Sequence, residues 1–200
     1  MHRESFSYPW WLAILLVIWL AGCLDTRTEE LQFRGTDIAG AAAGRDFHLT
    51  DQNGRMRSLA DFRGKVVLLT FGYTHCPDIC PTTLASLAAV VRSLGEEGKR
   101  VQVLFVTLDP ARDKPALLAR YMPFFNPDFL GLYGDDAATA AAAKAFGVFY
   151  QKQYTGSASG YTLDHSAGIY AFDPQGRLRL HMAYDSSAKD IAHDVRLLMN

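Results

Sequence analysis

Cysteine is scarce in this chain, and its scarcity narrows the chemistry of the protein. Of three cysteines, Cys23 follows an amino-terminal apolar stretch, and only Cys76 and Cys80 lie in the rest of the chain. A fold held together by several disulfides is therefore excluded. A bridge between Cys76 and Cys80 would close a loop of about five residues and stabilise the fold by roughly 2 kcal/mol. This spacing is poor for a structural link, so we expect the pair to exchange electrons or to hold a metal ion.

Most of the chain also lacks tryptophan, an excess of basic charge and long apolar runs. All three tryptophans stand at or before residue 19, in the segment that precedes Cys23. The chain carries 20 basic and 21 acidic side chains with no basic block, which excludes a nucleic-acid partner. The apolar stretch Trp10–Leu20 has the length of a signal-peptide core and is too short to span a bilayer comfortably.

The amino terminus has the features of an export signal. Arg3 supplies positive charge before the apolar stretch, and the small residues Ala21 and Gly22 directly precede Cys23. This arrangement resembles a lipobox, so we expect residues 1–22 to be a lipoprotein signal peptide and Cys23 to be lipidated. An uncleaved membrane anchor is the alternative. Either one would tether the protein to the membrane of the bacterial cell envelope, with its domain on the outer (periplasmic or extracytoplasmic) face.

The remainder of the chain divides into a tether and one domain. Residues 23–45 are polar and then rich in glycine and alanine, which predicts a flexible tether. Residues 46–200 alternate between apolar runs suited to strands and amphipathic stretches suited to helices. The expected strands are 66–71, 101–108, 130–133 and 148–154, the expected helices are 80–94, 114–122, 136–146 and 186–199, and hairpins are expected at 47–59 and 168–182.

This order of elements predicts an α/β fold with a mixed central sheet flanked by helices. The cysteine pair follows the apolar strand at 66–71 and precedes the first helix of the domain. A dithiol at such a junction, with a closing hairpin and helix later in the chain, is the arrangement of thioredoxin-like folds. The pattern therefore favours that fold class.

Cys76 and Cys80 are spaced to act together. With Cys76 in the loop and Cys80 in the first helical turn, both sulfurs face the same side, and the amino end of the helix lowers the pKa of at least one thiol. Three residues separate the pair, whereas dithiol oxidoreductases typically have two. Thiolates favour soft ions, above all Cu(I). Two thiolates would leave a three-coordinate copper ion one ligand short, which directs attention to the histidines.

His165 is the histidine best placed for this role. It lies in the polar segment 161–166, which we expect to be a loop that faces the dithiol in a thioredoxin-like fold. A solvated loop histidine is the alternative. His75 adjoins Cys76, but neighbours on an extended segment point in opposite directions. The other histidines that follow Cys23 are expected at the surface or in an ordinary strand: His48, His181 and His193.

With these motifs in place, the chain resembles the Sco (SenC) family of copper chaperones for cytochrome c oxidase assembly. Residues 71–82, Phe-Gly-Tyr-Thr-His-Cys-Pro-Asp-Ile-Cys-Pro-Thr, match the metal motif of that family. Shorter matches are Leu108–Pro115, Phe146–Val148 and Asp164–Ser166. The resemblance covers about residues 47–198 and implies a thioredoxin-like fold with an extra amino-terminal β-hairpin.

The resemblance also implies a function and a set of partners. Cys76, Cys80 and His165 would be the copper ligands, with the ion carried as Cu(I), Cu(II) or both. The copper would pass to the binuclear site of cytochrome c oxidase subunit II, and another copper donor protein or a thioredoxin-like reductant would be further partners. The family is usually held by one transmembrane helix, so the lipobox sets this chain apart in its anchor.

Three aspartates near these motifs are candidates for a supporting role. Asp109 and Asp164 are candidates to orient His165 or to take a proton from a thiol, and Asp78 is a candidate to tune the charge between the cysteines. The alternatives are a turn or a cap for Asp109, an outward-facing side chain for Asp164 and a helix amino-terminal carboxylate for Asp78. Arg112 is expected to be a surface salt-bridge partner rather than a contact for the receiving protein.

Several functions stay open on the sequence. A copper chaperone needs both cysteines and His165. A thiol-disulfide reductase that keeps the acceptor's copper-site cysteines reduced needs only the dithiol, and a copper or redox sensor is a further alternative. A peroxidase of the peroxiredoxin or glutathione-peroxidase kind is disfavoured, because Tyr73 stands where those enzymes carry a threonine, three residues before the cysteine.

Overall fold

The computed structural model describes residues 32–41, 46–154, 156 and 160–200. The predicted signal peptide, Cys23 and much of the predicted tether lie outside these ranges. Within them, no helix combines the length and the apolar character that crossing a membrane requires.

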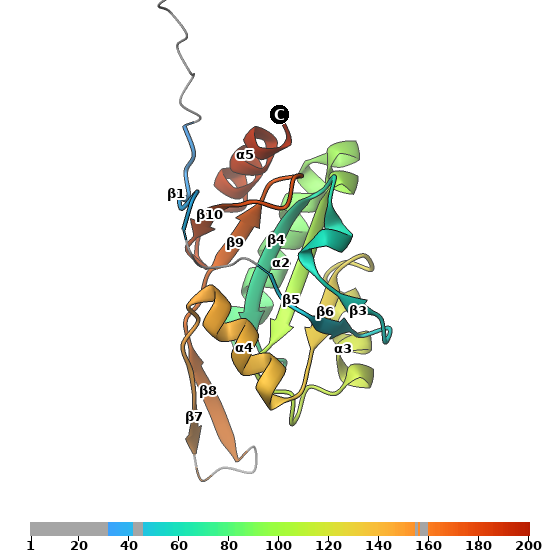
Figure 1. The fold of residues 1–200 in the computed structure, drawn as a ribbon, viewed down its shortest axis with the longest axis vertical. Helices are drawn as coiled ribbons and strands as arrows, with labels where there is room; N and C mark the ends of the chain where they lie inside the picture. Colours follow the sequence, from blue (N-terminus) through green and yellow to red (C-terminus); the bar gives the residue numbers. More distant parts are fainter. Residues whose placement is uncertain (1–31, 42–45, 155, 157–159) are drawn as a thin grey trace, which may run out of the picture. The chain divides into compact units, whose positions relative to one another are not determined.

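Between residues 66 and 146 strands and helices alternate, as the sequence predicts (Figure 1). The strands are β1 (Thr36–Asp37), β2 (Leu49–Asp51), β3 (Met56–Arg57), β4 (Val66–Gly72), β5 (Val101–Thr107), β6 (Leu130–Tyr133), β7 (Tyr150–Tyr154), β8 (Tyr161–His165), β9 (Ile169–Phe172) and β10 (Leu178–Met182). The helices are α2 (Ile79–Ser93), α3 (Pro115–Tyr121), α4 (Asp136–Phe146) and α5 (Ala188–Met199), and the 3-10 helices are η1 (Leu59–Phe62), η2 (Gly95–Arg100) and η3 (Met122–Phe124).

A mixed sheet forms the centre of the domain, as the α/β prediction requires. Its strand order is β1-β10-β9-β4-β5-β6-β2-β3. Strands β4, β5 and β6 run parallel, and the other neighbouring pairs are antiparallel. Every residue of β4 and of β5 is buried, as their apolar runs require of strands that are covered on both faces.

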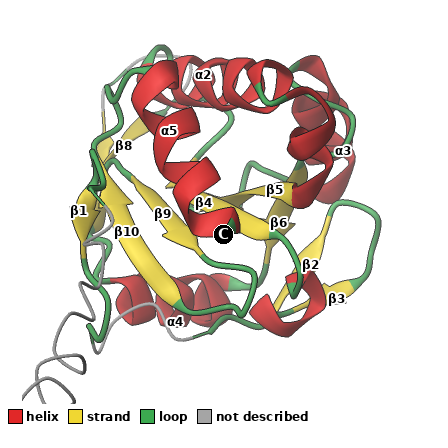
Figure 2. Ribbon diagram, turned by 90° about the horizontal axis from the view of Figure 1, so that it is seen from above, coloured by secondary structure: helices red, strands yellow, loops and turns green. Residues whose placement is uncertain are grey.

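Helices cover both faces of this sheet, with α2, α3 and α5 on one side and α4 on the other (Figure 2). Phe146, at the end of α4, packs edge-on against Phe71 of β4 and Tyr170 of β9, with ring centroids 5.3 and 5.2 Å away. The Tyr170 hydroxyl donates a hydrogen bond to the carbonyl oxygen of Phe146 at 2.9 Å, so the buried ring keeps a polar partner. This packing holds the carboxyl end of β4, where the cysteine motif begins.

Strands β7 and β8 form a second sheet of two strands that extends away from the main sheet (Figure 1). Its register pairs Tyr150 with His165 and Tyr154 with Tyr161. The prediction of a loop at residues 161–166 is wrong, because Tyr161–His165 is a strand. Leu163 is its one buried residue, so no apolar run marks this strand in the sequence.

The segment that precedes the domain is partly structured, contrary to the tether predicted for residues 23–45. Strand β1 pairs with β10 at the edge of the main sheet. The backbone amides of Arg34 and Gly35 donate to the buried carboxylate of Asp194 on α5, at distances of 2.7 to 3.0 Å. The compact unit therefore begins at Phe33, inside the predicted tether.

Candidate metal centre

The cysteine pair lies where β4 ends and α2 begins. Cys80 stands in the first turn of α2 and is buried, whereas Cys76 in the preceding loop is partly exposed; both are free thiols. The Cys80 amide donates to the Cys76 sulfur at 3.5 Å. Gly72 makes room for Cys80, since a Cβ at residue 72 would stand 2.6 Å from the Cys80 sulfur and 2.8 Å from the ring of Phe105. The structure thus brings the two cysteines together.

The two thiols differ in acidity. The hydrogen bond from the Cys80 thiol has the largest effect on the pKa of Cys76. It outweighs burial, which would raise that pKa, and lowers the pKa of Cys76 to about 3. The same hydrogen bond, together with burial, raises the pKa of Cys80. Cys76 is therefore a thiolate at neutral pH and the nucleophile of the pair, while Cys80 keeps its proton.

His165 approaches the pair from strand β8. Its Nε2 atom lies 3.7 Å from the Cys80 sulfur, and its Nδ1 atom lies 2.9 Å from the carbonyl oxygen of Ser166. Because a carbonyl oxygen only accepts, Nδ1 carries the proton, and Nε2 of the neutral ring presents its lone pair toward the cysteines. Burial opposes a charged ring, but hydrogen bonds to the Cys76 sulfur and Ser166 outweigh it and raise the pKa of His165.

Cys80 and His165 are separated by a distance that suits two ligands of one ion. Sulfur and nitrogen ligands at about 2.3 and 2.0 Å from an ion stand roughly 3.5 Å apart, close to the 3.7 Å between these side chains. Among the residues that the structure describes, no three His, Cys, Asp or Glu side chains already stand at metal-binding distances.

The cavity beside Cys80 and His165 is small, with a volume of about 10 Å³. It offers space on the scale of a single water molecule or ion and excludes an organic substrate. Larger cavities of about 560, 500, 410 and 220 Å³ are lined by other residues, and neither cysteine nor His165 lines any of them. The space beside Cys80 is therefore too small for an organic molecule, whereas Cys76 is partly exposed to solvent.

Asp113, which the sequence analysis did not single out, holds the cysteine loop. Its buried carboxylate accepts hydrogen bonds from the Thr74 amide at 2.9 Å and the Thr74 hydroxyl at 2.5 Å. The Thr107 hydroxyl, at the end of β5, donates to it at 2.6 Å. Three donors satisfy this buried charge. No local pattern predicts the contact, because Thr74 and Asp113 are 39 residues apart.

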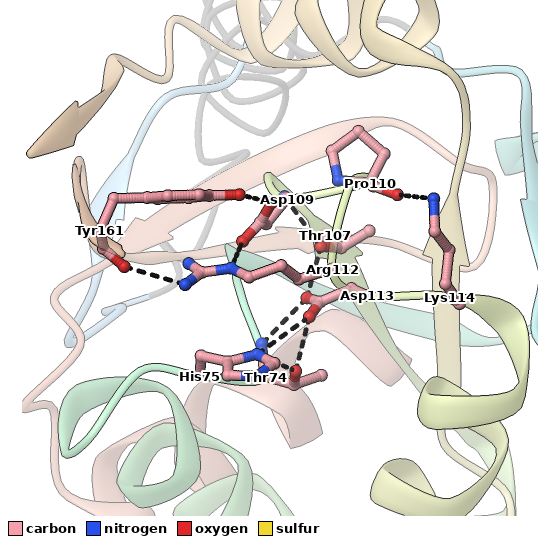
Figure 3. Close-up of polar contacts among 9 residues, drawn as sticks. All are labelled: Thr74, His75, Thr107, Asp109, Pro110, Arg112, Asp113, Lys114 and Tyr161. Atoms are coloured by element: carbon pink, nitrogen blue, oxygen red, sulfur yellow. Dashed lines mark hydrogen bonds and ion pairs between the residues drawn. The ribbon is translucent and has the colours of Figure 1, made fainter. Parts of the chain in front are cut away.

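Asp109 contacts strand β8 at Tyr161 and not at His165, the residue that it was predicted to orient. Its buried carboxylate accepts hydrogen bonds from the Tyr161 hydroxyl at 2.8 Å and from the Arg112 guanidinium (Figure 3). Asp109 therefore holds Tyr161, four residues before His165, and does not orient His165 itself. Arg112 forms the predicted salt bridge, but its side chain is only 18% exposed, so the predicted surface position is wrong.

The other candidate residues lie at the margin of the site. Asp164 is exposed and faces away from His165, since successive residues of a strand alternate. Asp78 is exposed at the start of α2 and accepts from the Thr82 hydroxyl at 3.4 Å, which agrees with a helix amino-terminal carboxylate. His75 is exposed and contacts the Thr74 hydroxyl. The remaining histidines lie elsewhere: His48 on the surface, His181 against the ring of Tyr170, and His193 beside Asp194.

Comparisons with known proteins place this arrangement among a family. A sequence model of the family SCO1/SenC matches residues 35–200 of the chain. The human protein named SCO2 homolog, mitochondrial, is 41% identical over 181 residues, which cover 89% of this chain and 68% of the human protein.

Solved structures show the same similarity. ScoI from Bradyrhizobium japonicum, solved with copper bound, is 38% identical, with a TM-score of 0.72 over 78% of this chain and 99% of that one. Apo Sco1 from Thermus thermophilus is 40% identical, with a TM-score of 0.75 over 84% of this chain and 98% of that one. These similarities confirm the predicted thioredoxin-like α/β fold.

Proposed function

Because the chain belongs to the SCO1/SenC family, we propose that it carries copper on Cys76, Cys80 and His165. The supporting observation is the position of His165 Nε2, 3.7 Å from the Cys80 sulfur and on the same side as the Cys76 thiolate. Thiolates and imidazole are suitable ligands for a soft ion such as Cu(I). The similarity to a ScoI solved with copper bound supports the same ligand chemistry.

The copper would be delivered to the binuclear site of cytochrome c oxidase subunit II. Three protein ligands leave a position open on the ion, and Cys76 is partly exposed, so a thiolate or imidazole of the acceptor can reach the ion from solvent. The ligands on the ion are then exchanged one at a time. Copper requires both cysteines as thiolates, so a disulfide between them would block loading.

We also infer that the protein acts at the outer face of a bacterial envelope membrane, anchored by residues 1–22 or by lipid on Cys23. The compact unit begins at Phe33. A palmitate-labelling experiment tests this: label on the wild-type chain and none on Cys23→Ser supports the lipoprotein, and equal label on both contradicts it.

Copper titration of the reduced whole chain tests the ligand set. One copper per chain is expected in competition with a chromophoric Cu(I) chelator. Cys76→Ala and Cys80→Ala should abolish tight binding, because each removes one of only two thiolates. His165→Ala should weaken binding by at least about tenfold.

The exposed His48 provides the matched control, since His48→Ala removes a histidine outside the site. The expected affinity of this variant is that of the wild type. If His165→Ala also binds copper with wild-type affinity and spectrum, the assignment of His165 as a ligand is wrong.

A second candidate function, thiol-disulfide exchange, is favoured by the unequal exposure of the two cysteines. The partly exposed Cys76 thiolate is placed to attack a disulfide of the acceptor, and the buried Cys80 is placed to resolve the mixed disulfide. The acceptor would gain two thiols, and this chain would leave with a Cys76–Cys80 disulfide that a thioredoxin-like reductant must reduce. A reduction potential too oxidising to reduce the acceptor's disulfide would exclude this function.

A further inference from the structure

The two halves of the candidate centre come from separate sheets. The cysteines follow β4 of the main sheet, whereas His165 ends β8 of the two-stranded sheet. The ladder of β8 is formed with β7, and the main sheet reaches this strand only through the start of β9, where Ile169 pairs with Thr70 of β4 four residues after His165. Contacts made by β8 itself therefore also bear on the distance between His165 and the cysteines.

One loop, residues 108–114 between β5 and α3, contacts the cysteine half (Figure 3). Asp113 in this loop accepts both the amide and the hydroxyl of Thr74, two residues before Cys76. The Thr107 hydroxyl holds the same carboxylate from the end of β5. Because Asp113 is buried, these hydrogen bonds are shielded from water and fix the backbone that leads into the cysteine motif.

The same loop contacts the histidine half through Asp109 and Arg112 (Figure 3). The Arg112 guanidinium bonds the Asp109 carboxylate, donates to the carbonyl oxygen of Tyr161 at 2.9 Å and lies 3.7 Å from the centre of that ring. The Tyr161 hydroxyl donates a hydrogen bond to Asp109 at 2.8 Å, so Asp109, Arg112 and Tyr161 each contact the other two. The planar fork of an arginine suits such a set of simultaneous contacts, and a lysine cannot reproduce it.

Strand β8 transmits this contact to His165. Tyr161 and His165 lie four residues apart and face the same side of the strand. Between the two halves, the buried ring of Tyr73 lies 5.7 Å from the Arg112 guanidinium and 6.1 Å from the His165 ring, edge-on to the latter. Arg112, Tyr73 and His165 therefore lie along one side of β8, and a shift at Tyr161 moves the strand that carries His165.

We propose that the loop 108–114 sets the separation between the cysteine pair and His165, with Asp113 positioning the cysteine half and Arg112 positioning the histidine half. As a statement about copper, this inference rests on the proposed function. As a statement about where β8 stands, it does not depend on copper. Arg112 is a positioning residue, because it acts on the ion only through His165.

A double-mutant cycle tests Arg112. Arg112→Lys keeps the charge beside Asp109 but loses the fork, and it should weaken copper binding about tenfold, the usual effect of losing a group that orients a ligand. In a His165→Ala background, the same change should have no further effect, because the ligand that Arg112 positions is already absent. Equal losses in both backgrounds, or none in either, would overturn the proposal.

Two further variants separate positioning from stability. Arg57→Lys alters an arginine of matching burial that pairs with a buried aspartate in the β2–β3 hairpin, and copper affinity should stay unchanged. Asp113→Asn should weaken copper binding in both backgrounds, because it acts on the cysteine half. If Arg57→Lys weakens binding as Arg112→Lys does, the effect is one of general stability and the proposal fails.

Hydrogen exchange on the reduced, copper-free whole chain gives a readout independent of the metal. Arg112→Lys should speed exchange of the β8 amides at least about threefold and leave those of α2 unchanged. Unchanged exchange in β8 would overturn the positioning role even if copper binds as proposed. If exchange changes as expected while the wild-type chain binds no copper, the proposed function fails and the positioning role stands.

Discussion

Two hairpins of this domain carry the same kind of ion pair. Arg57 pairs with Asp51 in the β2–β3 hairpin, and Arg112 pairs with Asp109 beside the β7–β8 hairpin. The arginine side chains are 21% and 18% exposed, and both aspartate side chains are fully buried. Each guanidinium also lies near an aromatic ring, at 5.8 and 3.7 Å from its centre. By burial and chemistry the two pairs are closely matched.

They differ in the length of chain that each set of contacts spans. Arg57 and Asp51 are six residues apart in one hairpin, so their contact reinforces a turn that the main sheet already holds. Arg112 reaches Tyr161, 49 residues further on, and so joins a hairpin outside the main sheet to a loop beside the cysteines. Both ion pairs are local, and the difference is that Arg112 also makes the long-range contact with Tyr161 to which we assign the positioning role.

The largest expected difference comes from removing each arginine. Arg112→Ala leaves the buried Asp109 charge with the Tyr161 hydroxyl, and the free energy of unfolding should fall by about 3 kcal/mol. Arg57→Ala should cost about 1 kcal/mol, because Asp51 still accepts two backbone amides at 2.9 and 3.0 Å. Urea unfolding followed by circular dichroism measures both, and equal losses would contradict the distinction drawn between the hairpins.

The local pair should also carry a dependence on pH. Burial opposes the charge of Asp51, but the backbone amides and Arg57 outweigh it and lower its pKa from the ordinary 3.8. The unfolded chain therefore takes up the proton first, and the stability from Asp51, present above about pH 4, is lost as pH falls through the lowered pKa. Asp51→Asn should lower the free energy of unfolding by about 2 kcal/mol at neutral pH. It should also make the decrease in stability with falling pH less steep.

Acid unfolding monitored at several urea concentrations measures this dependence. Asp128→Asn alters an exposed carboxylate and should leave the loss of stability in acid as steep as in the wild type. A loss that is equally steep in Asp51→Asn would show that other groups account for it.

A smaller effect is expected at the hydroxyl of Tyr161. Tyr161→Phe removes the hydrogen bond to Asp109 but keeps the ring under Arg112 and the backbone carbonyl, so it should cost about 1 kcal/mol. Tyr154→Phe, on the neighbouring strand at 81% exposure, is the matched change and should be neutral. Thermal unfolding distinguishes them, and a neutral Tyr161→Phe would mean that the guanidinium alone holds the hairpin.

The smallest effect is expected at Lys152, whose ammonium lies 4.7 Å from the centre of the Tyr161 ring. Lys152→Ala removes this cation–π contact and should cost about 0.5 kcal/mol, well below the loss in Arg112→Ala. The exposed Lys189 gives the comparison variant, Lys189→Ala, with no expected change. A loss at Lys152 as large as at Arg112 would show that the charge over the ring, rather than the fork, secures the hairpin.

Most elements of the fold are predictable because their signals are local. The apolar runs of β4 and β5 and the Asp135 and Gly147 caps of α4 lie within a few residues of the structure they specify. Strands β1 and β8 were not predicted from the sequence, for a common reason. Each is a short, mostly polar segment whose strand conformation depends on a partner strand, and β1 finds its partner more than a hundred residues away.

The candidate centre divides in the same way. Cys76 and Cys80 are predictable from their spacing at the start of a helix, and His165 becomes a candidate through the family's motif. The contacts of Asp113 with Thr74 and of Arg112 with Tyr161 are not predictable, because each pairs residues 39 or more apart whose local patterns carry no sign of the other.

By itself, the sequence determined the order of most elements, the dithiol at the strand-to-helix junction and the family to which the chain belongs. These follow from short-range patterns: apolar periodicity, turn residues and a motif of fixed spacing. Only the tertiary structure decided which cysteine is the thiolate, which face of β8 carries His165 to the thiols, and which loop contacts both halves of the site. Burial, hydrogen bonding and charge at a point in space depend on residues that the chain brings together only when it folds.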